Sequence, residues 1–149
     1  MNDSFQKIIG FTIQAEGGER YTCDPNDPGG ATKYGISKRF NPDLDIEHLT
    51  LEQAEGVYFK RYWGPAGCPA LPAPLNMAAF DSAVNPGLGW VEETLKTCKD
   101  WRKLLFLRLL HYSQLVRENH AKAEYIGGWA ARVALLWNLC EQQETEKTA

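Results

Sequence analysis

The densest group of turn-forming residues lies near the N-terminus and reads, from residue 16 to residue 37, Glu16-Gly-Gly-Glu-Arg-Tyr-Thr-Cys-Asp24-Pro-Asn-Asp27-Pro-Gly-Gly30-Ala-Thr32-Lys-Tyr34-Gly-Ile-Ser37. Gly, Asp and Asn readily adopt turn conformations and Pro fixes them, so this stretch predicts either a loop or a short β-hairpin. Helical patterns dominate the rest of the chain. We therefore expect a mainly α protein, of the α+β class, with one irregular and β-prone loop near the N-terminus.

Apolar residues recur at helical spacing in five segments outside this loop. The first begins at Asp3 or Ser4 and stops at Gly17, while the second follows a capping box formed by Thr50 and Gln53. The segment that starts at Trp101 is apolar on nearly every side, so we expect it at the centre of the core. The later four helices are expected over about 51–62, 75–84, 101–119 and 125–140, and the polar tail from Glu141 is expected to fray.

Length, charge and the longest apolar stretch limit the classes of protein to which this chain can belong. A chain of 149 residues fits a single domain covering residues 1–149. The net charge is −3 and no basic stripe is visible, so nucleic acid is not an expected partner. The longest apolar stretch, residues 103–110, contains Arg108 and is far shorter than the ~20 residues of a membrane span. We expect a monomer without stable membrane insertion, and the first residues lack the pattern of a secretory signal peptide.

The cysteines and histidines do not predict a metal or cofactor site. Cys23, Cys68, Cys98 and Cys140 are 45, 30 and 42 residues apart, which matches no zinc or redox motif. We expect free and mostly buried thiols, no metal and no cofactor.

Glu16 is the first candidate for chemistry. At about 100° per residue it falls about 20° from Phe5, in the middle of the apolar stripe of the first helix, whereas a solvated glutamate would lie opposite. An apolar setting raises the pKa of a glutamate, as the acid that cleaves a glycosidic bond requires. Asp24, Asp27 or Thr32 in the following loop can supply the second polar group that holds or activates water. The alternative is that Glu16 simply ends a helix in solvent.

Other interpretations of the loop stay open. The closely spaced Asp and Asn oxygens are possible calcium ligands, although the spacing is not that of an EF-hand. The Asp side chains can also act as turn formers, and the hydroxyls of Thr32 and Ser37 can bond to the local backbone.

Aromatic residues and one asparagine are candidates for sugar binding. Tyr34, Tyr58, Tyr62 and Trp63 are close in sequence to the acidic loop and have faces on which sugar rings can stack, or they belong to the core. Asn85 can donate to a substrate or cap the helix before it.

Several motifs together resemble glycoside hydrolase family 108, the N-acetylmuramidases of phage endolysins and of bacterial proteins once called secretion activators. The first motif is the stretch quoted above, from Glu16-Gly-Gly to Ser37. The resemblance covers roughly residues 5–90 and 101–139, and its further matches are Leu49-Thr-Leu-Glu-Gln-Ala54, Tyr62-Trp63, Phe80-Asp81-x-Ala83-Val84-Asn85 and Gly128-Trp129-x-x-Arg132-Val133.

The resemblance implies a lysozyme-like fold and a peptidoglycan substrate. Glu16 is the implied catalytic acid. The wider lysozyme superfamily points to Asp27 and Thr32 as groups that activate water, with Asp24 as the alternative to Asp27. Contacts with the glycan strand are expected from five further residues, which are Asp24, Tyr34, Ser37, Tyr62 and Asn85.

Two features depart from the family pattern. Glu19 and Arg20 separate Glu-Gly-Gly from Tyr21, which lengthens the loop, and the peptidoglycan-binding segment is shortened after about residue 90. We expect an enzyme that hydrolyses the β-1,4 bond between N-acetylmuramic acid and N-acetylglucosamine. The alternatives are a catalytically weak peptidoglycan-binding protein and a lytic transglycosylase. A phage endolysin, held in the host cytoplasm until lysis and then acting on the cell wall, fits the absence of a signal peptide.

Overall fold

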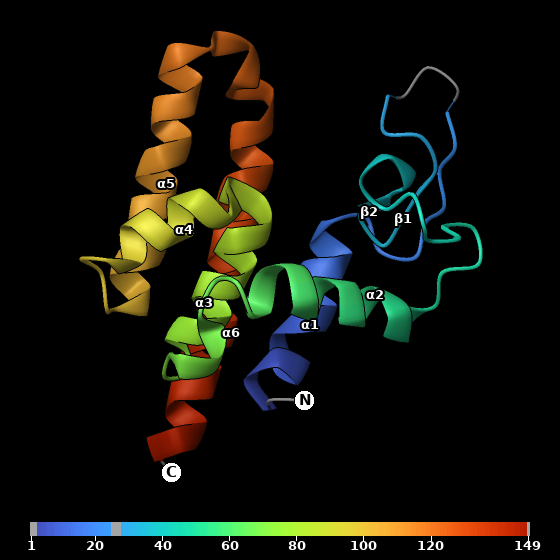
Figure 1. Cartoon of the computed structure of the whole chain (residues 1–149). Coiled ribbons are helices and arrows are strands. Elements are labelled where there is room, and N and C mark those ends of the chain that lie inside the picture. The colour runs from blue at the N-terminus through green and yellow to red at the C-terminus, as the bar shows by residue number, and fades with distance from the viewer. Residues whose placement is uncertain (1–2, 25–27, 149) are drawn as a thin grey trace. The chain divides into compact units, whose positions relative to one another are not determined.

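The computed structural model describes residues 3–24 and 28–148. The chain forms two compact units, Asp3–Arg61 and Tyr62–Ala149. Figure 1 shows the helices of both units and the small hairpin of the first. A single domain over residues 1–149 stays a prediction, since a division by contacts does not decide whether the units fold together.

Helix α1 (Asp3–Ala15) is the first element of the first unit. Its apolar stripe is buried as predicted, with Phe5, Ile8, Ile9 and Ile13 all at most 2% exposed. Burial of this face stabilises the helix by about 1.5–3 kcal/mol per large apolar side chain. The Gly18 N–H donates to the Ile13 carbonyl at 2.9 Å and ends the helix where the sequence predicts.

The predicted β-hairpin is present in the glycine-rich loop. Strands β1 (Thr32–Lys33) and β2 (Ile36–Ser37) are antiparallel, with Thr32 opposite Ser37. Tyr34 and Gly35 join them with φ values of 54° and 73°. Positive φ at both central residues defines a type I′ turn, whose twist matches that of the paired strands. On the other edge, Thr22 pairs with Thr32 through two backbone hydrogen bonds of 2.8 and 2.9 Å.

The short 3-10 helix η1 (Lys38–Phe40) follows the hairpin, and helix α2 (Leu51–Tyr58) comes next. The capping box is confirmed, because the Gln53 N–H donates to Thr50 Oγ1 and the Thr50 N–H donates to Gln53 Oε1. The α-helix ends four residues before the predicted end and continues as the π-helical segment η2 (Phe59–Trp63). Leu51, in the first turn of this helix, is 47% exposed.

In the second unit, the 3-10 helix η3 (Cys68–Ala70) precedes helix α3 (Leu75–Ser82). Every residue of α3 is buried, as its small side chains predict. The π-helical segment η4 (Ala83–Gly87) follows, and helix α4 (Leu88–Leu95) begins immediately after it. The sequence predicts the stop at residues 85–87 but not α4. Gly87, with φ of 116°, redirects the chain so that a new helix can start.

Helix α5 (Trp101–Glu118), the 3-10 helix η5 (His120–Tyr125) and helix α6 (Ile126–Thr148) complete the unit. Figure 1 shows α5 and α6 side by side and antiparallel. Asp100 caps α5 by accepting from the Lys103 N–H at 2.7 Å. Helix α5 contributes Trp101, Leu104 and Leu105 to the core, whereas its apolar residues Phe106, Leu109 and Leu110 are 37–59% exposed.

The expectation that the polar tail from Glu141 frays is wrong, because α6 continues to Thr148. Gln143 is 6% exposed, and Glu144 accepts from the Arg102 guanidinium at 2.6 and 3.1 Å and from Trp101 Nε1 at 3.2 Å. These tertiary contacts order a polar segment that would be a poor helix alone.

Within residues 3–24 and 28–148, no helix has the length and apolar character that a membrane span needs. The four cysteines are free thiols, with Cys23 exposed and Cys68, Cys98 and Cys140 buried.

Candidate active site

Glu16 lies directly after the last residue of α1. Its N–H donates to the Thr12 carbonyl at 3.1 Å and to the Ile13 carbonyl at 3.2 Å, so its backbone continues the helical turn. The side chain is half-buried, whereas Gln14 and Ala15 before it are exposed. The structure therefore places Glu16 toward the buried side of the helix, as the helical spacing predicts.

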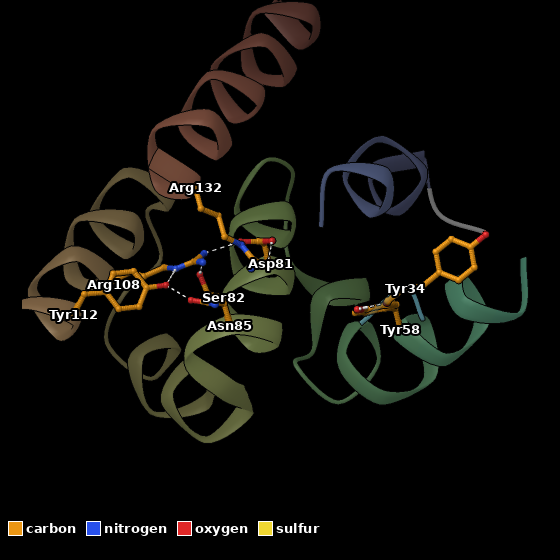
Figure 2. A network of polar contacts seen from close by, with 8 residues as sticks. All are labelled: Tyr34, Tyr58, Asp81, Ser82, Asn85, Arg108, Tyr112 and Arg132. Carbon is orange, nitrogen blue, oxygen red and sulfur yellow. Dashed lines mark hydrogen bonds and ion pairs between the residues drawn. The ribbon is translucent and has the colours of Figure 1, made fainter. Parts of the chain in front are cut away.

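The hairpin turn packs directly against Glu16. A Cβ atom at Gly35 would lie 2.6 Å from Glu16 Cβ and 2.6 Å from the Tyr58 hydroxyl oxygen, far inside van der Waals contact. The Tyr58 hydroxyl donates to the Tyr34 carbonyl at 2.9 Å, a buried hydrogen bond between α2 and the turn (Figure 2). Three separate segments therefore enclose the base of the Glu16 side chain.

Tyr34 links the turn to the loop that follows α1. Its N–H donates to the Gly18 carbonyl at 2.9 Å, and its side chain is only 6% exposed. Burial raises the pKa of Tyr34, and the nearby Glu19 carboxylate raises it further. The phenol is therefore protonated at neutral pH. The small exposed area of the ring leaves little surface for stacking a sugar.

The predicted hydroxyl and carboxylate partners lie along the same loop. Thr32 Oγ1 donates to the Gly30 carbonyl at 3.2 Å, which is the local backbone bond that the sequence leaves open as an alternative. Ser37 is half-buried, and its carbonyl accepts from Asn41 Nδ2 at 2.9 Å. Asp24 is exposed. Asp27 lies outside the described residues.

Two predicted substrate-binding residues belong to π-helical segments of the chain. Tyr62 lies in η2 and Asn85 in η4, and both are half-buried. Pro86 lacks the N–H that would continue an α-helical ladder, which accounts for the wider turn around Asn85. Single π-helical turns are rare and occur frequently at functional sites.

A buried ionic network holds this part of the second unit together. Asp81 accepts from Arg108 Nη1 at 2.7 Å, from Arg132 Nη2 at 2.8 Å and from Arg132 Nε at 3.1 Å. The Asp81 and Arg108 side chains are fully buried, and that of Arg132 is 9% exposed. Burial raises the pKa of Asp81, but the two guanidinium groups more than offset this, so the net pKa lies below its ordinary value.

The network reaches Asn85 through Tyr112. Arg108 Nε donates to the Tyr112 hydroxyl oxygen at 2.6 Å, and the Tyr112 hydroxyl donates to Asn85 Oδ1. Figure 2 shows Asp81, Ser82 and Tyr112 arranged around the Arg108 guanidinium.

Sequence reasoning assigned no role to the members of this network. Asp81 and Arg132 occur in the quoted motifs, and Arg108 was singled out only because it interrupts an apolar stretch. A charged residue inside an apolar helix is itself a signal, since buried charges are nearly always paired. Tyr112 gives no such signal, because a tyrosine in a core helix is common.

Metal binding gains no support from the geometry. In the part of the chain that the structure describes, no group of three or more His, Cys, Asp or Glu side chains could hold a metal ion. Asp27 is not among those residues.

Comparisons with known proteins agree with this architecture. The structure of Brucella abortus SagA matches with a TM-score of 0.66 and 22% sequence identity, covering 94% of this chain and 95% of that chain. The likeness shows that the two proteins share a fold, which in this chain is mainly α. No curated protein matched.

The family follows from the sequence match. Residues 9–87 match the family Glycosyl hydrolase 108, and the chain therefore belongs to glycosyl hydrolase family 108. This membership makes the protein a glycosidase of a peptidoglycan hydrolase family.

Proposed function

We propose that this protein is a lysozyme that hydrolyses the β-1,4 bond between N-acetylmuramic acid and N-acetylglucosamine in peptidoglycan, with Glu16 as the general acid. The family supports a glycosidase acting on peptidoglycan. The choice of bond and of acid is the proposal.

The packing around Glu16 is the observation that carries this assignment. A general acid must hold its proton within hydrogen-bond reach of the leaving oxygen, so its side chain needs a fixed base and an accessible tip. Gly35 and Tyr58 enclose the base of the Glu16 side chain, and half-burial leaves part of the residue open. Among the candidate carboxylates that the structure describes, Asp24 is exposed, whereas Glu16 is half-buried.

The second group of the proposed mechanism comes from the loop. We assign it to Asp27 with Thr32, and Asp24 is the alternative to Asp27. In an inverting glycosidase this carboxylate lies about 6.5–9.5 Å from the acid, which leaves room for the attacking water. The Thr32 hydroxyl would have to exchange its bond to the Gly30 carbonyl for one to that water.

The proposed function also includes contacts with the glycan strand and a role in the lysis of a host cell. Asp24, Tyr34, Ser37, Tyr62 and Asn85 are the proposed contacts with the glycan strand. The protein would act as a monomeric phage endolysin, held in the host cytoplasm until lysis.

Glu16→Gln tests the assignment. The change keeps the shape of the side chain and removes its titratable proton, so we expect lysis of purified sacculi to fall by about 10²–10⁴-fold with an unchanged Tm. Glu52→Gln is the matched control, because Glu52 is an exposed carboxylate in the first turn of α2, and it should keep the parental rate. A Glu16→Gln rate above one tenth of the parental rate would show that Glu16 is not the acid.

Mass spectrometry of the digested sacculi identifies the reaction. Hydrolysis produces reducing muramic acid ends, as we expect. Ends bearing 1,6-anhydromuramic acid would instead make the protein a lytic transglycosylase. Intact glycan that remains bound to the protein would make it a peptidoglycan-binding protein.

A further inference from the structure

The direction of the hydrogen bonds around Tyr112 is fixed by Arg108. A guanidinium has five N–H donors and no acceptor, so the contact of 2.6 Å between Arg108 Nε and the Tyr112 oxygen leaves that oxygen only as the acceptor. The hydroxyl proton of Tyr112 must therefore point to another partner. That partner is Asn85 Oδ1.

This directionality in turn orients the Asn85 amide. An asparagine side chain can present either its oxygen or its NH₂ group to a neighbour. Because the Tyr112 hydroxyl donates, Asn85 must present Oδ1 to it, and Nδ2 then faces the other way. Asn85 is half-buried, so part of the residue is exposed to solvent.

The remaining contacts make Arg108 and Tyr112 a rigid support. Arg108 Nη1 donates to Asp81 at 2.7 Å and to the Ser82 hydroxyl at 3.2 Å, and the Arg108 side chain is fully buried. The Tyr112 ring stacks on Trp129 with centroids 4.6 Å apart and an interplanar angle of 23°. Burial raises the pKa of Tyr112, so its hydroxyl keeps the proton that Asn85 needs at neutral pH.

We propose that Arg108 and Tyr112 are positioning residues that orient the Asn85 amide as a hydrogen-bond donor to the acetamido carbonyl of an N-acetylhexosamine unit. The proposal rests on the proposed function, since that function supplies a glycan rich in acetamido groups. It adds two residues of α5, Arg108 and Tyr112, to the five residues from which the sequence predicts contacts with the glycan strand. The support acts through Asn85 and does not itself touch the sugar.

Two variants test separately whether binding needs the Asn85 amide itself and whether it needs the amide to be oriented by Tyr112. Tyr112→Phe keeps the ring and its stacking but removes the hydroxyl, so Asn85 loses the partner that orients it. Asn85→Asp keeps an oxygen that can accept from Tyr112 but removes the Nδ2 donor. Loss of one neutral hydrogen bond corresponds to about a fivefold change in affinity, so each variant should raise KM for soluble peptidoglycan fragments about fivefold with kcat nearly unchanged.

The double variant tests whether the two residues act as one unit. If Tyr112 acts only by orienting Asn85, Tyr112→Phe combined with Asn85→Asp should raise KM no further than Asn85→Asp alone. Ser82→Ala is the matched control, because it removes a bond to the same guanidinium without touching the pair, and KM should stay within twofold. The proposal would be overturned if KM of the double variant rose by the product of the two single increases, or if Tyr112→Phe left KM unchanged.

Side-chain amide NMR gives a readout that does not need hydrolysis. The two Asn85 N–H resonances, assigned by their disappearance in Asn85→Asp, should be separate and sharp in the parent and should shift on addition of N-acetylglucosamine tetramer. Tyr112→Phe should broaden or merge them and weaken the titration. If the tetramer did not shift these resonances, the binding role of Asn85 would be refuted even in an active enzyme. If they shifted normally in a protein that does not lyse sacculi, only the proposed function would be refuted.

Discussion

At the scale of single residues, the close packing around the candidate acid depends on Gly35. Its φ of 73° is unfavourable for any residue with a Cβ, and a Cβ would lie 2.6 Å from that of Glu16. Positive φ costs a non-glycine residue about 1–2 kcal/mol, and overpacking costs about 1–3 kcal/mol more. Gly35→Ala should therefore lower the free energy of unfolding by about 2–5 kcal/mol and reduce lysis more than tenfold, measured by urea denaturation and by clearing of sacculi.

Gly67→Ala separates the cost of a positive φ from the cost of packing a Cβ against Glu16. Gly67 has nearly the same φ, 70°, but its added Cβ would meet nothing within 4 Å. It should lose only the backbone part, about 1–2 kcal/mol, and keep the parental rate of lysis. Equal losses of stability and activity in the two variants would show that contact with Glu16 does not matter.

Asp81 should make stability depend on pH in the acid range. Its pKa is lowered in the folded state, so its stabilising contribution is complete above the ordinary aspartate pKa of about 3.9 and is lost as pH falls through the lower folded value. Asp81→Asn leaves two buried guanidinium groups without their anion and should cost about 3–5 kcal/mol near neutral pH. Urea denaturation between pH 2 and 7 should show the gap between parent and variant narrowing below about pH 4. A gap that stays constant over this range would contradict the network.

At the scale of elements, the start of α2 depends on a short local signal. Thr50 and Gln53 satisfy each other's backbone N–H groups at 2.9 and 3.2 Å. Thr50→Ala should cost about 1 kcal/mol, as the loss of an N-cap usually does, and Thr50→Ser should restore most of it. Urea denaturation measures both. A loss below about 0.3 kcal/mol would mean that tertiary packing alone holds the start of this helix.

The predictions for helices failed where tertiary contacts outweigh local pattern. The tail after Glu141 is polar, yet α6 continues because Glu144 binds Arg102 and Trp101 of α5. The sequence did not predict α4, which packs against η4 and α3. The segment of α5 is apolar on nearly every side, but its partners cover only the side that carries residues such as Leu104 and Leu105. None of these partners is visible in the local sequence.

At the scale of the whole molecule, the protein should not depend on its cysteines for stability. Burial raises the pKa of Cys68 and of Cys140 to about 12, so both thiols stay protonated and unreactive at neutral pH. Cys23 is the exposed thiol. A thiol reagent should react quickly with one cysteine in the folded protein and with all four after denaturation. Fast reaction of two or more thiols in the folded state would contradict this burial.

The effect of a reductant on Tm is a second test of whether stability depends on the cysteines. Because the thiols are free, Tm should be unchanged by reductant. A decrease of more than about 10 °C would reveal a disulfide, since removal of a few kcal/mol shifts Tm by that much at this size.

The sequence by itself determined the features that depend on local chemistry. Helix α1 and its buried stripe, the type of loop after Glu16, the hairpin and the capping box all follow from residue spacing, turn propensity and side chains three residues apart. The motifs also identified the family, because they preserve those local requirements in order. Glu16 could be singled out because a carboxylate on an apolar stripe conflicts with the pattern around it.

Only the tertiary structure decided which distant residues meet. The contact between Gly35 and Glu16 joins a turn to a helix end, and the bond from Tyr58 to Tyr34 spans 24 residues. The pairing of Asp81 with Arg108 and Arg132 brings together residues 27 and 51 positions apart. The sequence marks such groups only as unusual, because burial makes a charge require a partner without specifying which one. The choice of partner comes from how the helices pack.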